Sequence, residues 1–311
     1  MKRFAASTLL ILLLLLSGCG NEQPSSIGRT APTSQPVATA TTPVTSTPVP
    51  TPASGAGVVI DARFIDVGQG DCEILKIAQG SSTFFALVDT GDQHAYTKIS
   101  SDLSEMGCNE INVLVLTHPD ADHVGSATGV LNNYKVDRVW QSGFTKKTKV
   151  WQDTSATINA KQIPSETVQK GTQDVWNGVT VKVLNPTPQT STDSNNSSVV
   201  LLVSVGEKDI LLMGDAENEA QANMAQDTLP KVEVYKVPHH GSAGAYYPPF
   251  LNAIHPDYSV IEVGAGNSYG HPRPEVLQAL VGIGSKVYRT DQNGDVDATV
   301  TPDSVDVKSE R

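Results

Sequence analysis

The sequence has few cysteines, few aromatic residues and few charges, and each shortage excludes a class of protein. Three cysteines in 311 residues cannot form a disulfide-based scaffold. Aromatic residues make up only 5%, which argues against an aromatic platform that stacks single-stranded nucleic acid. Charged residues make up 18% and hydrophobic residues 39%, which excludes a coiled coil, a wholly disordered chain and a polytopic membrane protein. The net charge of −11 argues against a passive DNA coat.

Residues 1–18 have the pattern of a lipoprotein signal peptide. Lys2 and Arg3 precede an apolar run over 4–16, which is shorter than the roughly 20 residues that span a bilayer. Residues 16–19 read Leu-Ser-Gly-Cys and resemble the bacterial lipobox, which implies cleavage before Cys19 and lipid attachment to its sulfur. An ordinary secretory signal is the alternative. We expect an extracytoplasmic, membrane-anchored protein, and loss of Lys2 and Arg3 takes its net charge from −11 to −13.

Residues 19–57 are predicted to be the lipidated cysteine and a disordered linker. The segment is rich in Thr, Pro, Ser and Ala, so it cannot bury enough apolar area to offset its chain entropy. Proline makes such a segment extended, which suits a tether. A role of its own, such as cell-wall contact, is the alternative. Residues 58–311 are predicted to form the folded domain.

The folded part alternates apolar strands with helices in two successive halves, which predicts an α/β domain with helices outside. Cys72 and Cys108 lie beside apolar runs and are expected to be buried; a disulfide between them stays open. Residues 143–176 are too polar to assign. Helices are expected at 96–106, 124–131, 217–229 and 274–283, and strands at 58–66, 72–77, 83–88, 113–116, 136–140, 179–184, 199–205, 210–213, 232–237, 258–263 and 287–289.

Two histidines and two aspartates lie within six residues, directly after the strand expected at 113–116. They are His118, Asp120, Asp122 and His123. Burying these side chains is costly unless something binds them, and a divalent metal ion does so. Histidine with aspartate suits Zn²⁺ or Mn²⁺. We expect the first two residues to serve one ion and the last two a second; a polar surface loop is the alternative.

This run resembles the His-x-His-x-Asp-His signature of the metallo-β-lactamase superfamily, with Asp120 in place of the second histidine. The variant is similar to that of the β-lactamase-like domain of the ComEC competence proteins. Motifs at 66–71, 87–91, 211–215, 237–242 and 267–272 agree with that family in order. The resemblance covers residues 58–300 and implies a four-layer αββα sandwich. Because the membrane segments of ComEC itself are absent, we expect a stand-alone lipoprotein.

The resemblance also implies a set of site residues at the ends of strands. Asp215 matches the aspartate that bridges two ions, although a helix N-cap is the alternative. His239 is expected as a ligand, with His240 behind it or donating a proton to the leaving group. His271 is expected to contact substrate or act as a general acid, unless it only stabilises its loop. The predicted metal ligands are His118, Asp120, Asp122, His123, Asp215 and His239, and the predicted catalytic residues are Asp122, Asp215, His240 and His271.

Five other polar residues are expected around the ligands rather than on the ions: Asp66, Asp71, Asp89, Asn195 and Asn196. Asp89 is expected to orient the histidine loop. Asp66 and Asp71 flank a glycine turn that shapes the site or is only a turn. The third histidine of the superfamily is missing, and two asparagines stand in its region. An asparagine oxygen or a water is expected to complete the first metal site.

Three imidazoles and three carboxylates shift the metal preference toward Mn²⁺, with Zn²⁺ as the alternative. Two such ions stabilise both the attacking and the leaving oxygens of an in-line displacement, and Asp122 or Asp215 could orient the attacking water. Phosphodiesters suit this chemistry. We therefore predict a metal-dependent hydrolase, a phosphodiesterase or nuclease with DNA as the substrate that the family implies.

Other functions stay open. The negative net charge disfavours binding of DNA. The small basic cluster of Lys146, Lys147 and Lys149 is expected to be a solvated loop. A small-molecule or wall-polymer phosphodiester such as a phosphorylcholine ester, or a lactone, is the alternative substrate. A non-enzymatic surface binding module is the second alternative. The sequence indicates no protein partner.

Overall fold

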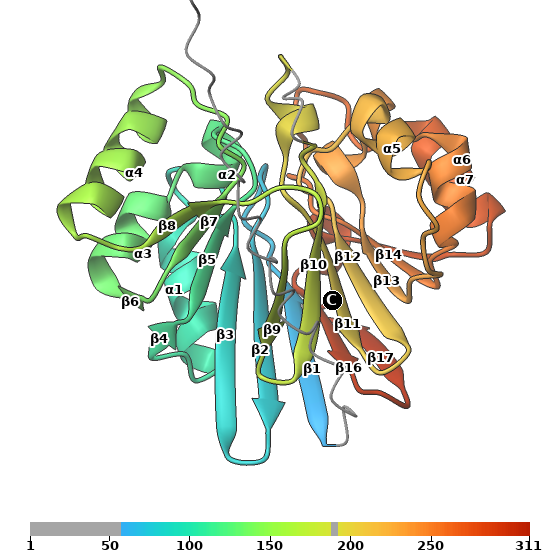
Figure 1. Cartoon of the computed structure of the whole chain (residues 1–311). Coiled ribbons are helices and arrows are strands. Elements are labelled where there is room, and N and C mark those ends of the chain that lie inside the picture. Colours follow the sequence, from blue (N-terminus) through green and yellow to red (C-terminus); the bar gives the residue numbers. More distant parts are fainter. Residues whose placement is uncertain (1–56, 188–191) are drawn as a thin grey trace, which may run out of the picture. The chain divides into compact units, whose positions relative to one another are not determined.

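Two β-sheets pack face to face in the computed structural model, and helices cover the outer face of each sheet (Figure 1). The structure describes residues 57–187 and 192–311. The predicted signal peptide, Cys19 and the linker lie outside the described residues, apart from Gly57. In the described ranges, no helix is long and apolar enough to cross a membrane.

The first sheet has eight strands in the order β17-β16-β1-β2-β3-β5-β7-β8. Strands β1, β2 and β3 pair antiparallel, whereas β3, β5, β7 and β8 pair parallel. The strands are β1 (Val58–Phe64), β2 (Glu73–Gln79), β3 (Ser82–Val88), β5 (Val113–Leu116), β7 (Val139–Gln141), β8 (Ser165–Thr167), β16 (Val296–Val300) and β17 (Val305–Ser309). A separate two-stranded ladder joins β4 (Glu110–Ile111) to β6 (Lys135–Val136).

The second sheet has seven strands in the order β15-β14-β13-β12-β11-β10-β9. Its last four strands in sequence, β12 to β15, pair parallel, so their carboxyl ends meet at one edge. The strands are β9 (Gln173–Trp176), β10 (Val179–Asn185), β11 (Val200–Val205), β12 (Lys208–Leu212), β13 (Val234–Lys236), β14 (Tyr258–Ile261) and β15 (Lys286–Arg289).

Three apolar clusters separate four layers and confirm the predicted αββα sandwich. The cluster between the sheets includes Phe64 and Trp176, the cluster under the first helix layer includes Leu103, and the cluster under the second includes Phe250. Helices α1 to α4 cover the first sheet and α5 to α7 the second (Figure 1). The helices are α1 (Tyr96–Glu105), α2 (Ala121–Val124), α3 (Ala127–Asn133), α4 (Lys149–Ala160), α5 (Asn218–Met224), α6 (Pro248–Ile254), α7 (Pro274–Gly282) and α8 (Thr290–Asn293).

Most predicted elements occur, with two corrections. The single helix expected over 124–131 is two helices, α2 and α3, because Gly125 and Ser126 interrupt it. The strand expected over 136–140 is split between β6 and β7, which belong to different sheets. Helices α4, α6 and α8 and strands β4, β8, β9, β16 and β17 were not predicted, since short or half-polar elements leave a weak periodic signal.

Both cysteines of the folded part are buried and free. Cys72 and Cys108 lie in the cluster under α1, and they form no disulfide. Burial raises the pKa of the Cys108 thiol to about 11. The sequence had left the disulfide open, and the structure decides against it.

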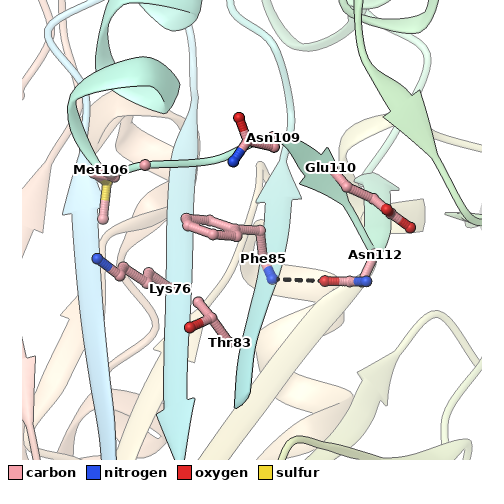
Figure 2. A pocket seen from close by; sticks show the side chains of 8 residues that line it. Lys76, Thr83, Phe85, Met106, Asn109, Glu110 and Asn112 are labelled. Atoms are coloured by element: carbon pink, nitrogen blue, oxygen red, sulfur yellow. Dashed lines mark hydrogen bonds between the residues drawn. The ribbon is translucent and has the colours of Figure 1, made fainter. Parts of the chain in front are cut away.

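A surface hollow of about 460 Å³ opens on β2 and β3 near the end of α1 (Figure 2). Lys76, Thr83 and Phe85 line it from the strands, and the Phe85 amide donates to Asn112 Oδ1 at 2.9 Å. None of its lining residues is a histidine or aspartate, so it is separate from the predicted metal site.

Candidate metal centre

The predicted site residues lie where parallel strands of both sheets end. His118 and the histidine loop follow β5, Asp215 follows β12, and His239 follows β13. Asp89 comes directly after β3, which is parallel to β5. Because the two sheets face each other, these strand ends bring residues that are distant in sequence into contact, such as His118 and Asp215, which are 97 positions apart.

A glycine turn braces the histidine loop. The Asp71 amide donates to the Asp122 carbonyl at 3.1 Å. A Cβ on Gly70, whose φ is +147°, would lie 2.5 Å from that same oxygen. Only glycine allows this approach, so the turn at 66–71 supports the loop that carries His118 to His123. Asp66 lies at the outer end of the turn, where its Oδ2 pairs with Arg311 Nη2 at 2.8 Å.

Buried ligand atoms without hydrogen-bond partners face one another across the two sheets. They are the Nε2 atoms of His118, His123 and His240 and Oδ1 of Asp215. Unsatisfied buried polar atoms are costly, and imidazole nitrogens with carboxylate oxygens are the usual ligands of Zn²⁺ and Mn²⁺. The residues present therefore fit divalent metal ions.

On one side of Asp215 lie His118, Asp120 and His239, here called the first half-site. His118 Nε2 is 3.7 Å from Asp215 Oδ2 and 3.8 Å from Asp120 Oδ1. His239 Nε2 is 3.8 Å from Asp215 Oδ2. The first half-site thus contains two imidazoles and one carboxylate, with Asp215 as a shared neighbour.

On the other side of Asp215 lie Asp122, His123 and His240, here called the second half-site. His123 Nε2 is 3.3 Å from Asp215 Oδ1, and His240 Nε2 is 3.4 Å from Asp122 Oδ2. Atoms of His123, Asp215, His240 and Asp71 all lie within 4.8 Å of one another. The second half-site is therefore the tighter cluster.

His239 and His240 take opposite half-sites because of the backbone between them. Both have left-handed φ angles, 47° and 52°. Such strain costs of order 1–3 kcal/mol for a residue other than glycine and concentrates at functional sites. His239 Nδ1 bonds Glu217 Oε1 at 2.7 Å, and His240 Nδ1 donates to the Glu262 carbonyl at 2.9 Å. These contacts direct both Nε2 atoms toward the aspartates.

The residues that were predicted to surround the ligands differ in whether they contact the histidines. Asp71 Oδ1 lies 3.1 Å from His240 Nδ1, behind the imidazole rings. Asn195 Nδ2 lies 3.3 Å from His239 Nδ1, whereas Asn196 Oδ1 accepts from the Ala220 amide of α5. Asn196 therefore binds the helix and does not face the half-sites.

The carboxylates and histidines shift one another's pKa values. Burial, with His123, lowers the pKa of His118, which leaves its imidazole neutral. Burial opposes ionisation of Asp215, yet His123 and His240 hold its pKa well below the usual range. Burial also disfavours a charged His240, but Asp71 and Asp122 raise its pKa to about 10. The carboxylates thus favour protonated imidazoles at this site, and binding of a divalent cation would release those protons.

His271 lies at the rim with an exposed aromatic ring beside it. Its ring centroid is 5.5 Å from that of His239 and 5.8 Å from that of Tyr269, which is 61% exposed. His271 Nδ1 is buried without a hydrogen-bond partner. Burial and the fields of His239 and His240 lower the pKa of His271 to about 4, so this ring is neutral at pH 7.

Sequence reasoning missed a buried charged group beneath the site. Lys236 is fully buried, contacts Asp71 Oδ2 and lies 3.8 Å from Glu262 Oε2, and Glu73 is buried nearby. Burial raises the pKa of Glu73 to about 8. The available signal was one charged residue within an otherwise apolar strand, as for Lys236 in β13.

The basic cluster is not wholly a solvated loop, which corrects the prediction. Lys146 Nζ bonds Asp120 Oδ2 at 2.6 Å, although 26 residues separate the two. Lys149 pairs with Asp153 on the surface of α4, and Lys147 is exposed. One lysine of the cluster therefore reaches the first half-site.

Comparisons with known proteins agree with this geometry. The family model described as "Metallo-beta-lactamase superfamily" matches residues 75–264. The chain is 31% identical over 255 residues to ComE operon protein 3 of Bacillus subtilis, covering 73% of this chain and 33% of that protein. It is 28% identical to competence protein ComA of Neisseria gonorrhoeae, covering 74% of this chain and 30% of that one. The chain thus spans about a third of the length of these relatives.

A solved structure is similar in fold. CmlA, a diiron β-hydroxylase from Streptomyces venezuelae, superposes with a TM-score of 0.50 at 15% identity. The match covers 78% of this chain and 54% of CmlA. The resemblance to the metallo-β-lactamase superfamily and to the ComEC relatives, first inferred from six short motifs, is confirmed.

Proposed function

Because the chain belongs to the metallo-beta-lactamase superfamily, we propose that it is a metal-dependent phosphodiesterase that cleaves nucleic acid. Superfamily membership supports the coarser statement, a metal-dependent hydrolase. The observation that carries the proposal is Asp215, whose two oxygens face different half-sites: Oδ1 toward His123 and Oδ2 toward His118. A carboxylate in this position would suit a site for two cations, because it could serve as a ligand that the two cations share.

Six side chains around Asp215 would hold the ions. His118, Asp120 and His239 would bind the first, and Asp122, His123 and His240 the second. His240 is a ligand in this proposal, because its Nε2 is buried, unpartnered and close to Asp122. Mn²⁺ and Zn²⁺ both suit this mixture of nitrogen and oxygen donors. When bound, the ions would polarise the phosphoryl group and stabilise its developing negative charge.

The chain's own residues have separate tasks in this proposal. The Asp122 side chain is 37% exposed; partial burial opposes its ionisation, but the contact with His240 keeps its pKa below the usual range. Its carboxylate can therefore accept a hydrogen bond from the attacking water. Neutral His271 at the rim is a hydrogen-bond partner for the substrate rather than a charged anion site. Asp71 and Glu217 orient His240 and His239 from behind.

Nucleic acid is favoured over a small diester by one aromatic contact. Tyr269 is one of three large hydrophobic side chains that are strongly exposed among the described residues, and its ring stacks on His271. An exposed ring beside the reacting site can stack on a base, which contributes about 1–3 kcal/mol per base. One of the relatives is named as a competence protein, which agrees with this substrate class. A small phosphodiester or a lactone without an aromatic ring would not stack on Tyr269.

The proposed location is the outer face of the bacterial membrane. It is supported by the charged start, the short apolar run and the lipobox-like residues that end at Cys19. A lipid on Cys19 and the linker over 19–57 would tether the hydrolase domain, predicted at 58–311, to the membrane. The partners in this proposal are the membrane and a phosphodiester substrate.

A hydrolysis assay tests the proposal. The purified chain is stripped of metal, then supplied with Mn²⁺ or Zn²⁺ and with single-stranded DNA, duplex DNA or bis-p-nitrophenyl phosphate. We expect metal-dependent cleavage of DNA that falls about a thousandfold in Asp215→Asn, since loss of several kcal/mol of charge stabilisation is expected. Asp303→Asn, at an exposed position in the loop before β17, is the matched control.

The outcomes separate the candidate functions. Cleavage of bis-p-nitrophenyl phosphate alone would replace DNA with a small diester. If metal-loaded protein hydrolyses none of the three substrates, the phosphodiesterase proposal is rejected, and a lactonase or a surface binding module takes its place.

A further inference from the structure

Asp120 differs from the other candidate ligands because a cation of the chain already binds it. Lys146 Nζ contacts both of its oxygens, at 2.6 Å for Oδ2, and Ser194 Oγ donates to Oδ1 at 2.6 Å. Lys146 belongs to the loop between β7 and α4, and its side chain reaches Asp120 of the histidine loop. Its side chain is about one-third exposed. The contact is therefore a partly buried ion pair at the edge of the first half-site.

Within the described ranges, no lysine or arginine pairs with Asp122, the carboxylate of the second half-site, whose partner there is His240. Oδ1 of Asp215 and the Nε2 atoms of His123 and His240 are buried and lack any hydrogen-bond partner. Their atoms also form a group within 4.8 Å of one another. In the described residues, no group of this kind includes Asp120, His118 or His239. The two half-sites thus differ in geometry and in whether a lysine already binds their own carboxylate.

We propose that the Lys146 ammonium competes with a metal ion for Asp120, so that the first half-site binds its ion more weakly than the second. An ammonium and a divalent ion on one carboxylate repel each other, and the lysine must leave before Asp120 can bind the ion. This inference rests on the proposed function for its choice of metal ligands. It adds that occupancy of the first half-site is controlled by a residue of the chain.

The displaced ammonium has a second role. Once Asp120 binds the ion, Lys146 loses its partner but stays at the rim of the first half-site. A free ammonium there pairs with an anionic oxygen, such as a phosphoryl oxygen of a diester. Lys146 therefore favours anionic phosphodiesters over neutral esters and lactones. A merely structural salt bridge would have neither effect.

Calorimetric titration with Mn²⁺ tests the competition. The metal-stripped chain is compared with Lys146→Met, which keeps the length of the side chain without its charge, and with the matched control Lys147→Met at the exposed neighbouring position. We expect wild type to bind one ion tightly and one weakly. Lys146→Met should strengthen the weak step about tenfold and leave the tight step unchanged. Lys147→Met should change neither step.

Equal affinities in all three proteins would overturn the competition, and so would weaker binding in a Lys146→Met variant that keeps its melting temperature. If wild type and Lys146→Met each bind a single ion, the proposal is also wrong. None of these results needs turnover. Failure of the hydrolysis assay therefore rejects the proposed function without affecting this measurement.

Inorganic phosphate probes the second role. It is titrated into the Mn²⁺-loaded chain, where Lys146→Met should bind phosphate about tenfold more weakly than wild type. Lys146→Arg should restore the affinity because it restores the charge, and Lys147→Met should behave as wild type. The same phosphate affinity in all four proteins would overturn the role of Lys146 in anion binding.

Discussion

His123 Nδ1 lies 2.6 Å from Oδ2 of Asp89. Asp89 stands at the end of β3 with a left-handed φ of 56°, and its Oδ1 also accepts from the Thr117 amide at 2.8 Å. One carboxylate on the neighbouring parallel strand thus ties both ends of the histidine loop. It also sets the tautomer of His123, because a donating Nδ1 leaves Nε2 free to bind a metal ion.

We predict that Asp89→Asn weakens metal binding about 10–100-fold, the usual effect of removing a partner of a ligating histidine. The asparagine side chain keeps the shape of the aspartate, but only one of its two terminal atoms can accept a hydrogen bond. The measurement is a Mn²⁺ or Zn²⁺ titration of metal-stripped protein. Asp92→Asn is the control, because Asp92 Oδ1 only accepts from the His94 amide, which an asparagine oxygen also does. The same metal affinity in both variants would show that Asp89 does not orient the ligand.

His271 is predicted to titrate at about pH 4 in the metal-stripped protein, compared with 6.5 for an ordinary histidine. Burial, His239 and His240 all disfavour its charged form. Between pH 6.5 and 4 the unfolded chain then binds a proton that the folded chain does not. The contribution of His271 to stability therefore falls as the pH drops through this window. Its ring resonances in an NMR titration measure the pKa directly.

The low pKa of His271 also has a consequence for how stability depends on pH. When the pH is lowered from 7 to 5, the urea midpoint of unfolding should fall less for His271→Gln than for wild type. His255→Gln is the control, since His255 is exposed at the end of α6. A His271 ring that titrates near pH 6.5 would contradict the prediction.

Tyr269→Ala should raise the KM for single-stranded DNA about 10–100-fold, as expected for the loss of one stacked base. The inhibition constant of inorganic phosphate should not change, because phosphate has no ring that could stack on Tyr269. Tyr269→Phe keeps the ring and should keep the affinity for DNA. Parallel losses of affinity for DNA and for phosphate would mean that Tyr269 supports the loop of His271 instead of binding a base.

Gly125 is predicted to be essential for packing of the histidine loop. A Cβ there would lie 2.3 Å from the Asp92 carbonyl carbon and 2.5 Å from the Ala121 carbonyl oxygen, both in the backbone. Gly125→Ala should therefore lower the free energy of unfolding by about 1–3 kcal/mol or more. Gly282→Ala is the control, because nothing lies within 4 Å of its Cβ position. Urea unfolding measures both, and equal stability of the two variants would refute the packing argument.

The ligand-bearing segments were readable from the sequence because each is local. His118, Asp120, Asp122 and His123 lie within six residues after an apolar strand, and Asp215 and His239 each follow another one. Strand periodicity and turn residues depend on near neighbours in the chain, so an α/β domain with helices outside could be predicted from them, and the resemblance of the motifs to a family implied the αββα sandwich. The prediction failed where an element was short or half-polar, as at β16 and α4.

Only the tertiary structure decided which side of Asp215 each histidine takes. His239 and His240 are adjacent, and their separation depends on Glu217 and on the Glu262 carbonyl, each 22 residues from its histidine. The pair of Lys146 and Asp120 likewise joins two loops from different strand ends. Contacts of this kind are set by how the strands of two sheets meet, and that information is absent from any local pattern of residues.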